Sequence, residues 1–143
     1  LVDRMGISAY FQLIGAHEKP NLERLIHAWR EVRADVSRAR ARADKPLVFT
    51  EVGYHSQKGT AAKPWDEAAD HPLGLEEQAR CYRAFVRVWG GVSYLRGAYF
   101  WNWFGFGGPS SREYTPRGKP AARVICGWYG AAAGECPTRF GMR

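Results

Sequence analysis

Three short apolar runs alternate along the chain with longer segments in which apolar residues recur every three or four positions. Such uninterrupted runs are typical of strands in a parallel sheet, and the longer spacing is typical of helices with one buried stripe. The predicted strands cover residues 46–51 and 95–104, and within residues 5–14 a short strand runs into a loop, with Tyr10 and Phe11 near the strand's C-terminal end. The predicted helices cover residues 21–42 and 75–89 and a last segment that begins at Pro120. The pattern therefore predicts strand and helix in strict alternation.

Alternating strands and amphipathic helices are the signature of βα units, so we predict an α/β fold. Three units are too few to close a barrel, which leaves two alternatives. One is a small open three-layer domain, and the other is the C-terminal part of a (β/α)8 barrel. Long Gly- and Pro-rich loops at 53–74 and 105–118 follow strands, as active-site loops do in barrel enzymes. We expect one unit at 1–130 and an irregular tail at 131–143.

The composition favours a folded domain, because 45% of the 143 residues are hydrophobic and 14% are aromatic. The net charge of +7 could suggest a nucleic-acid partner, but the arginines of residues 22–42 are interleaved with acids. That arrangement is typical of a solvated helix, so we expect no nucleic-acid binding. No apolar run approaches the roughly 18 residues of a membrane span, and no signal peptide is visible, so localisation cannot be read.

The three cysteines Cys81, Cys126 and Cys136 have no CxxC spacing. This predicts neither a zinc site nor a disulfide framework, and we expect Cys81 and Cys126 to be small buried hydrophobic residues. We expect no metal or cofactor.

A carboxylate, Glu51, directly follows the apolar run Pro46 to Phe49 and one threonine. A buried strand excludes a charge unless the charge is paired or used. At the carboxyl end of a barrel strand, catalysis is the favoured use. The alternative is a structural glutamate that caps the next loop or pairs with an arginine.

Aromatic residues close the other two predicted strands, with Tyr10 near the end of the first and Trp101, Asn102 and Trp103 near the end of the third. Flat rings beside a carboxylate and an amide suit sugars, whose CH faces stack on indole while their hydroxyls form hydrogen bonds. By strand alternation Trp101 and Trp103 share one face and Asn102 takes the other. The alternative is that these rings belong to the core.

Four segments together resemble glycoside hydrolase family 113, the β-mannanases in the clan of retaining (β/α)8-barrel glycosidases. The segments are "GISAYF", "KPLVFTEVGY", "YLRGAYFWNWF" and "EYTPRGKPAARVICGWY", and the string F-T-E-x-G-Y is the most specific part. The resemblance covers residues 3–130 and implies that the chain holds strands six to eight of the barrel.

The resemblance also implies roles for individual residues. Glu51 matches the catalytic nucleophile, Tyr10 matches a tyrosine that hydrogen-bonds the nucleophile, and Trp101 matches the tryptophan under the reacting sugar. A carbohydrate partner follows, with further substrate contacts expected from Trp103, Asn102, Tyr54 and His55.

The chain departs from the family pattern because the acid/base glutamate of the family comes from strand four. Asp66, Asp70 and Glu113 lie in long loops and have no strand to hold them in position. We therefore expect the chain alone to be inactive, with the missing barrel half in the same polypeptide or with self-association through exposed edges. The alternative function is a non-catalytic glycan-binding or pseudo-enzyme module.

Overall fold

A computed structural model describes residues 2–130, and it confirms the alternation of strand and helix. The elements are β1 (Met5–Ser8), α1 (Leu22–Ala43), β2 (Leu47–Gly53), α2 (Leu75–Trp89), β3 (Leu95–Trp101) and α3 (Pro120–Trp128). The tail predicted at 131–143 lies outside the described residues.

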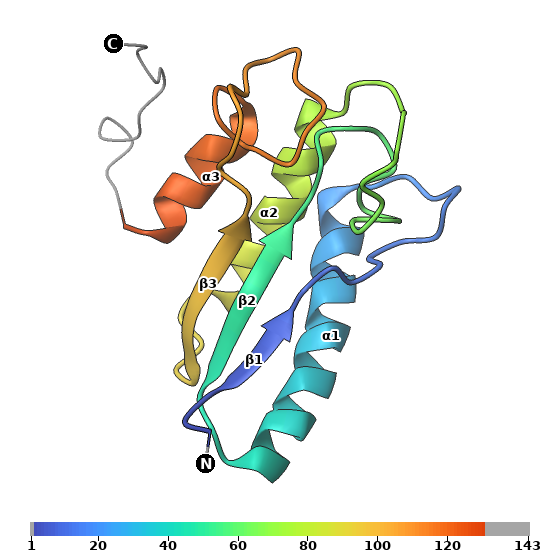
Figure 1. The fold of residues 1–143 in the computed structure, drawn as a ribbon. Coiled ribbons are helices and arrows are strands. Elements are labelled where there is room, and N and C mark those ends of the chain that lie inside the picture. The colour runs from blue at the N-terminus through green and yellow to red at the C-terminus, as the bar shows by residue number, and fades with distance from the viewer. Residues whose placement is uncertain (1, 131–143) are drawn as a thin grey trace.

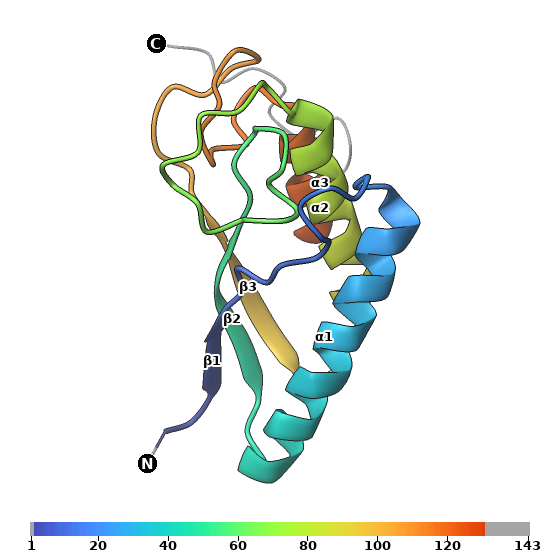
Figure 2. The same cartoon turned by 90° about the vertical axis from the view of Figure 1, so that its right-hand side faces the viewer.

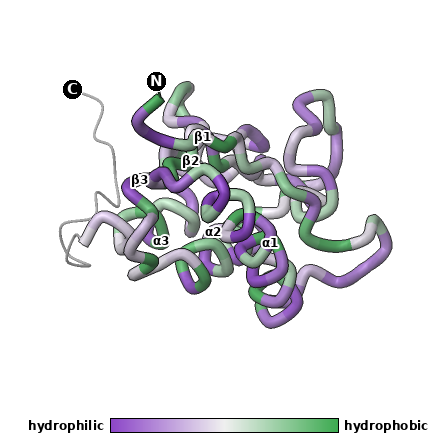
Figure 3. Tube along the Cα trace, turned by 90° about the horizontal axis from the view of Figure 1, so that it is seen from below, coloured by the Kyte–Doolittle hydropathy of each residue, from purple (hydrophilic) through white to green (hydrophobic). Residues whose placement is uncertain are grey.

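The three strands form one parallel sheet in the order β1-β2-β3, and the helices lie on a single face of it (Figures 1 and 2). Seen from below, sheet and helices form two separate layers (Figure 3). The three-layer alternative would need helices on both faces. One helical layer with an open inner face is instead the arrangement of a barrel wall.

Two helix ends show why the sequence folds in this way locally. The Asn21 side chain caps α1 by accepting a hydrogen bond from the Arg24 amide at 2.9 Å. At the C-terminal end of α1, Asp44 adopts the left-handed conformation that commonly ends a helix. The helix α2 ends at Gly90, whose amide bonds to the carbonyl of Val86.

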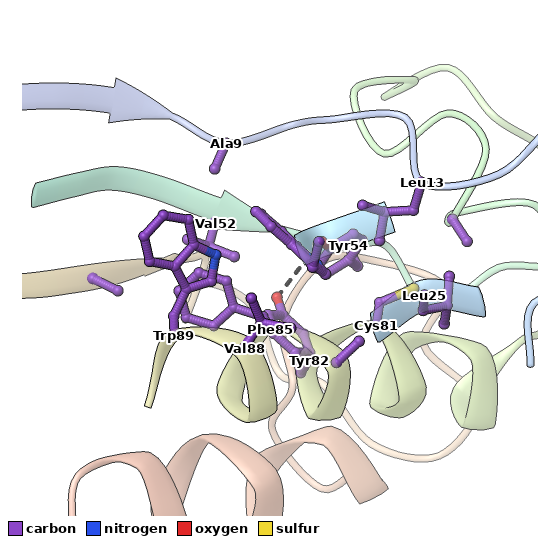
Figure 4. Close-up of a cluster of buried hydrophobic side chains, with 14 of the residues drawn as sticks. Ala9, Leu13, Leu25, Val52, Tyr54, Cys81, Tyr82, Phe85, Val88 and Trp89 are labelled. Carbon is purple, nitrogen blue, oxygen red and sulfur yellow. Dashed lines mark hydrogen bonds between the residues drawn. The ribbon is translucent and has the colours of Figure 1, made fainter. Parts of the chain in front are cut away.

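Aromatic side chains fill the core between the sheet and α2 (Figure 4). Phe49 of β2 meets Trp89 edge to face at 4.7 Å between ring centroids, and Trp29 of α1 meets Phe85 at 5.3 Å. Edge-to-face pairs add stability beyond the area they bury. The packing fixes β2, the central strand, against both long helices.

Two strands are shorter than predicted. β1 ends at Ser8 and β3 ends at Trp101, where the peptide bond to Asn102 is cis. The apolar run continues past β1 because the loop that follows buries Leu13 and Ile14, whereas past β3 it continues into a loop that exposes Phe104 and Phe106. Strand alternation therefore ends at Trp101, and the predicted faces of Asn102 and Trp103, which rest on that alternation, do not follow from it.

Cys81 is buried and free, which confirms one prediction. Cys126 is half-buried and disulfide-bonded, so the expectation of a buried reduced thiol was wrong for this residue. The cysteine spacing excludes a regular framework of disulfides, but it does not exclude a single disulfide.

Candidate functional site

A register shift in β2 directs Glu51 to the open face of the sheet. Phe49 and Val52 both lie in the core with no exposed surface, so two residues, Thr50 and Glu51, separate them instead of the single residue of a regular strand. Thr50 is exposed on the open face and lies 3.3 Å from the Ser8 hydroxyl. Bulges of this kind re-aim side chains next to active sites.

The hydroxyl of Tyr10 donates a hydrogen bond of 2.8 Å to Oε2 of Glu51. Burial and the neighbouring carboxylate raise the pKa of Tyr10 well above its ordinary value. The hydroxyl therefore keeps its proton and remains a donor. The carboxylate predicted to be functional and the tyrosine predicted to contact it thus lie together in the structure.

Gly53 allows Trp101 to approach this pair. A Cβ atom built on Gly53 would lie 2.9 Å from Cε1 of Tyr10, 3.0 Å from the carbonyl oxygen of Trp101 and 3.2 Å from its Cβ. A side chain at this position would push the two aromatic residues apart. Tyr10 and Trp101 therefore flank the end of β2, two residues beyond Glu51.

Two side chains of α2, Gln78 and Tyr82, hydrogen-bond backbone atoms at the ends of β2 and β3 and in the loops that follow. The Tyr82 hydroxyl accepts from the Tyr54 amide and donates to the Trp101 carbonyl, both at 3.4 Å. The buried Gln78 amide donates to the carbonyls of Tyr54 at 2.8 Å and Tyr114 at 2.9 Å. The pattern of apolar positions did not reveal these contacts, because Gln78 is polar and lies beside the stripe that the periodicity marks.

The loop after β3 presents aromatic rings to solvent. Trp103 is 38% exposed, Phe104 75% and Phe106 96%, and Phe104 meets Trp101 edge to face at 6.5 Å. The Asn102 side chain accepts from the Phe104 amide at 3.3 Å, so it stabilises the turn. Arg117 donates to the carbonyls of Trp103 and Gly105, which ties the loop to the segment before α3.

Tyr54 and His55 lie deeper than a substrate-contact role would suggest. Tyr54 has no exposed surface and packs edge to face on Tyr82 in the core (Figure 4). His55 is 2% exposed, its Nε2 lies 3.3 Å from the Lys63 carbonyl, and burial lowers its pKa. Neither ring offers surface to a ligand at the strand ends.

A buried lysine joins the two long loops, and no hydrophobic periodicity marks its position. Lys119 is 4% exposed and donates to the Ser56 hydroxyl at 2.7 Å and to the Glu113 carbonyl at 2.8 Å. Burial lowers its pKa to about 8. Tyr114, next to Glu113, meets Tyr10 edge to face at 6.3 Å, so the second loop also packs against the Glu51 site.

The other acids considered from the sequence do not share the position of Glu51. Asp70 pairs with Arg112 at 2.5 Å in an exposed ion pair. Asp66 lines a small cavity beside His55, and the Glu113 side chain is exposed.

Within residues 2–130, no group of three or more His, Cys, Asp and Glu side chains could hold a metal ion. No helix in this part of the chain is long and apolar enough to cross a membrane.

The geometry offers a half-buried carboxylate with one oxygen held by a protonated phenol, beside a tryptophan at the end of the next strand. Such a carboxylate can act as a nucleophile or stabilise a developing positive charge.

Comparison with known proteins gives a family match. The model of Glycoside Hydrolase Family 113 matches residues 1–110. A search among curated proteins found no significant match.

Solved structures of family 113 enzymes share the fold. A β-mannanase from Alicyclobacillus acidocaldarius, solved in complex with ManMIm, is 28% identical with a TM-score of 0.72, over 92% of this chain and 40% of that one. A β-1,4-mannanase of the same family is 24% identical with a TM-score of 0.69, at the same coverage. A β-glucuronidase from an uncultured Clostridium sp. shares the fold at 17% identity and a TM-score of 0.57, over 90% of this chain and 23% of that one. The chain thus spans about 40% of the length of the mannanases it matches.

Proposed function

Because the chain belongs to glycoside hydrolase family 113, we propose that it supplies the nucleophile part of a retaining, β-mannanase-like active site. In a retaining site an ionised carboxylate attacks the anomeric carbon while a second carboxyl group protonates the leaving oxygen. Water then hydrolyses the glycosyl-enzyme, and the second group acts as the base. We assign the nucleophile role to Glu51.

The observation that carries this assignment is the 2.8 Å hydrogen bond from Tyr10 to Oε2 of Glu51. Among the described residues no second donor reaches the carboxylate, so Oε1 stays available for attack.

Trp101 is proposed as the platform under the reacting sugar, with Trp103 and Asn102 extending it. The buried His55 and Tyr54 would support the loop that carries them and would not touch the sugar.

We further propose that β1, β2 and β3 are strands six, seven and eight of the barrel, and that the acid/base glutamate comes from strand four, outside this chain. Asp66, Asp70 and Glu113 sit on loops, which hold a proton donor less accurately than a strand does. The chain alone is therefore expected to hydrolyse nothing, whereas the full-length gene product is expected to be active.

The test uses the full-length gene product and a β-mannan oligosaccharide. Glu51→Gln should abolish almost all turnover while the protein still folds, and Glu113→Gln should leave turnover nearly unchanged. A 2-deoxy-2-fluoro glycoside that traps the covalent intermediate should label the peptide containing Glu51, as read by mass spectrometry. Near-normal activity of Glu51→Gln would rule out the assignment.

The second candidate is a non-catalytic glycan-binding module, favoured by the exposed rings of Phe104 and Phe106. It predicts a full-length protein without turnover that binds saccharides. Isothermal titration calorimetry should then show binding that is lost in Trp101→Ala and unchanged in Glu51→Gln.

A further inference from the structure

A cavity of about 640 Å³ opens between the loop after β1 and the first turn of α2. Its walls include Ile14, Pro20, Leu73 and Leu75, and none of the residues assigned to the Glu51 site lines it. The volume lies within the range of small-molecule sites.

Three cationic side chains line this cavity: Lys19, Lys58 and Arg80. Across residues 2–130, no carboxylate lies within ion-pair distance of any of them. The Nε atom of Arg80 is buried and has no hydrogen-bond partner in the described part of the chain. A buried donor without an acceptor is costly, and a bound anion would satisfy it.

The acids that line the cavity are already engaged. Glu18 accepts from the Gly15 amide and from Arg24, both at 2.6 Å. Glu77 accepts from the amides of Gly59 and Ala61 at 3.0 and 3.1 Å. The third acid, Glu76, lies 3.7 Å from Arg83. Glu77 bonds only to neutral amides and keeps its charge, so three cations without an ion-pair partner face one such carboxylate, and the net unpaired charge is positive.

The first turn of α2 carries two acids, Glu76 and Glu77, so its free amides add only a local contribution to the positive potential. Gly74 stands at the N-cap position and supplies no side chain to the free amides of the first turn. Helix N-terminal amides favour an anion. The apolar walls, with Leu73 38% exposed, would cover the face of a ring.

We propose that this cavity binds a small carboxylate with an apolar ring face, the class to which uronic acids belong, at a site separate from Glu51. The carboxylate would accept hydrogen bonds from Arg80 and lie near Lys19 and Lys58, and the ring would pack on Leu73 and Leu75. The proposal does not depend on the hydrolase assignment, because no residue is shared between the two sites.

The probes are sodium glucuronate and its neutral counterpart glucose, titrated into the full-length gene product by isothermal titration calorimetry. Glucuronate should bind at least 10-fold more tightly than glucose. Arg80→Met should weaken glucuronate binding about 10-fold or more, because a charged hydrogen bond contributes about 1.5–3 kcal/mol. Lys58→Met should weaken it about 2- to 5-fold, because Lys58 is exposed and lies near the carboxylate without a hydrogen bond to it. Arg87→Met is the matched control and should bind normally, because Arg87 is an exposed residue in the last turn of the same helix.

Lys58 is exposed, so Lys58→Met decides the question if Arg80→Met does not fold. The proposal is overturned by equal binding of glucuronate and glucose, by unchanged binding in Lys58→Met, or by no binding at tens of millimolar. Binding of inorganic phosphate without binding of glucuronate also overturns it. Glu51→Gln should bind glucuronate as the wild type does, and a loss there would place the ligand at the other site.

Discussion

The chemistry of Glu51 depends on which way one side chain points. Regular alternation from Phe49 would bury Glu51 against the helices, and the register shift before Val52 turns it to the open face instead. There it meets Tyr10, whose raised pKa keeps the phenol protonated. A donor that cannot lose its proton near neutral pH stabilises the ionised carboxylate without competing for protons.

The first prediction concerns that donor. Tyr10→Phe removes one hydrogen bond to a charged group, which contributes about 1.5–3 kcal/mol, so kcat/KM on a β-mannan oligosaccharide should fall about 10- to 150-fold. Steady-state kinetics of the full-length gene product measure the effect. Tyr94→Phe is the matched control, because the Tyr94 hydroxyl lies 2.6 Å from the Ser37 hydroxyl, just before the start of β3 and away from Glu51 at the end of β2. Equal activity of the two variants would contradict the role of Tyr10.

A second prediction tests the close approach at Gly53. In Gly53→Ala the new methyl group would meet Tyr10 and Trp101 at 2.9–3.2 Å, so overpacking should cost about 1–3 kcal/mol in the free energy of unfolding. Gly97→Ala is the control in the neighbouring strand, where a Cβ meets nothing within 4 Å. Urea denaturation of both variants should show a clear loss for the first only. Similar midpoints would mean that the strand ends can separate without cost.

At the scale of elements, α2 positions the ends of β2 and β3 as well as covering the sheet. Its first two turns carry three side chains that bond to backbone atoms of the surrounding loops and strand ends, namely Glu77, Gln78 and Tyr82. The parallel ladder fixes the strands only as far as Gly53 and Trp101. Beyond that point, side chains of the helix take over the hydrogen bonding.

A third prediction follows for Gln78. Gln78→Met keeps the volume but leaves the carbonyls of Tyr54 and Tyr114 without their donor, which should destabilise the protein by about 2–4 kcal/mol. Gln12→Met is the control, because Gln12 is exposed and donates to the single carbonyl of Ile14. Thermal unfolding should separate the two variants by several degrees. A Gln78 variant as stable as the control would show that water replaces the lost donor.

The order of elements could be predicted because buried parallel strands and amphipathic helices leave distinct periods in the sequence. Glu51 and Tyr10 could be recognised because each stands near the carboxyl end of an apolar run, and the family motif joins them. The register shift, the polar contacts of Gln78 and the disulfide of Cys126 could not be predicted. Each depends on residues that meet only in three dimensions, and none changes the hydrophobic pattern.

At the scale of the whole molecule, the sheet has one covered face and one open face. The helices bury Phe49, Val52 and Phe100, while Thr50 and Tyr99 are exposed on the other side. Within residues 2–130, β1 and β3 each pair with β2 alone, so each keeps one free edge. A closed barrel removes such edges and turns the open face into its interior, which agrees with family 113 membership.

The last prediction is a pH dependence of global stability set by Lys119. Its pKa is about 8 in the folded protein, below its ordinary value of 10.5, because burial penalises the charged form. Between these two values the unfolded chain binds more protons than the folded one, so stability should rise with pH from about 8 upward. The buried tyrosines, whose pKa values are raised, lower the stability above about pH 10, which is the opposite direction.

Urea unfolding of the full-length gene product should therefore compare wild type with Lys119→Met at pH 7, 8, 9 and 9.5. The wild type should gain stability relative to the variant across this range, because methionine binds no proton in either state. A constant difference between the two proteins would mean that Lys119 keeps its ordinary pKa, and that its contacts with Ser56 and Glu113 compensate fully for its burial.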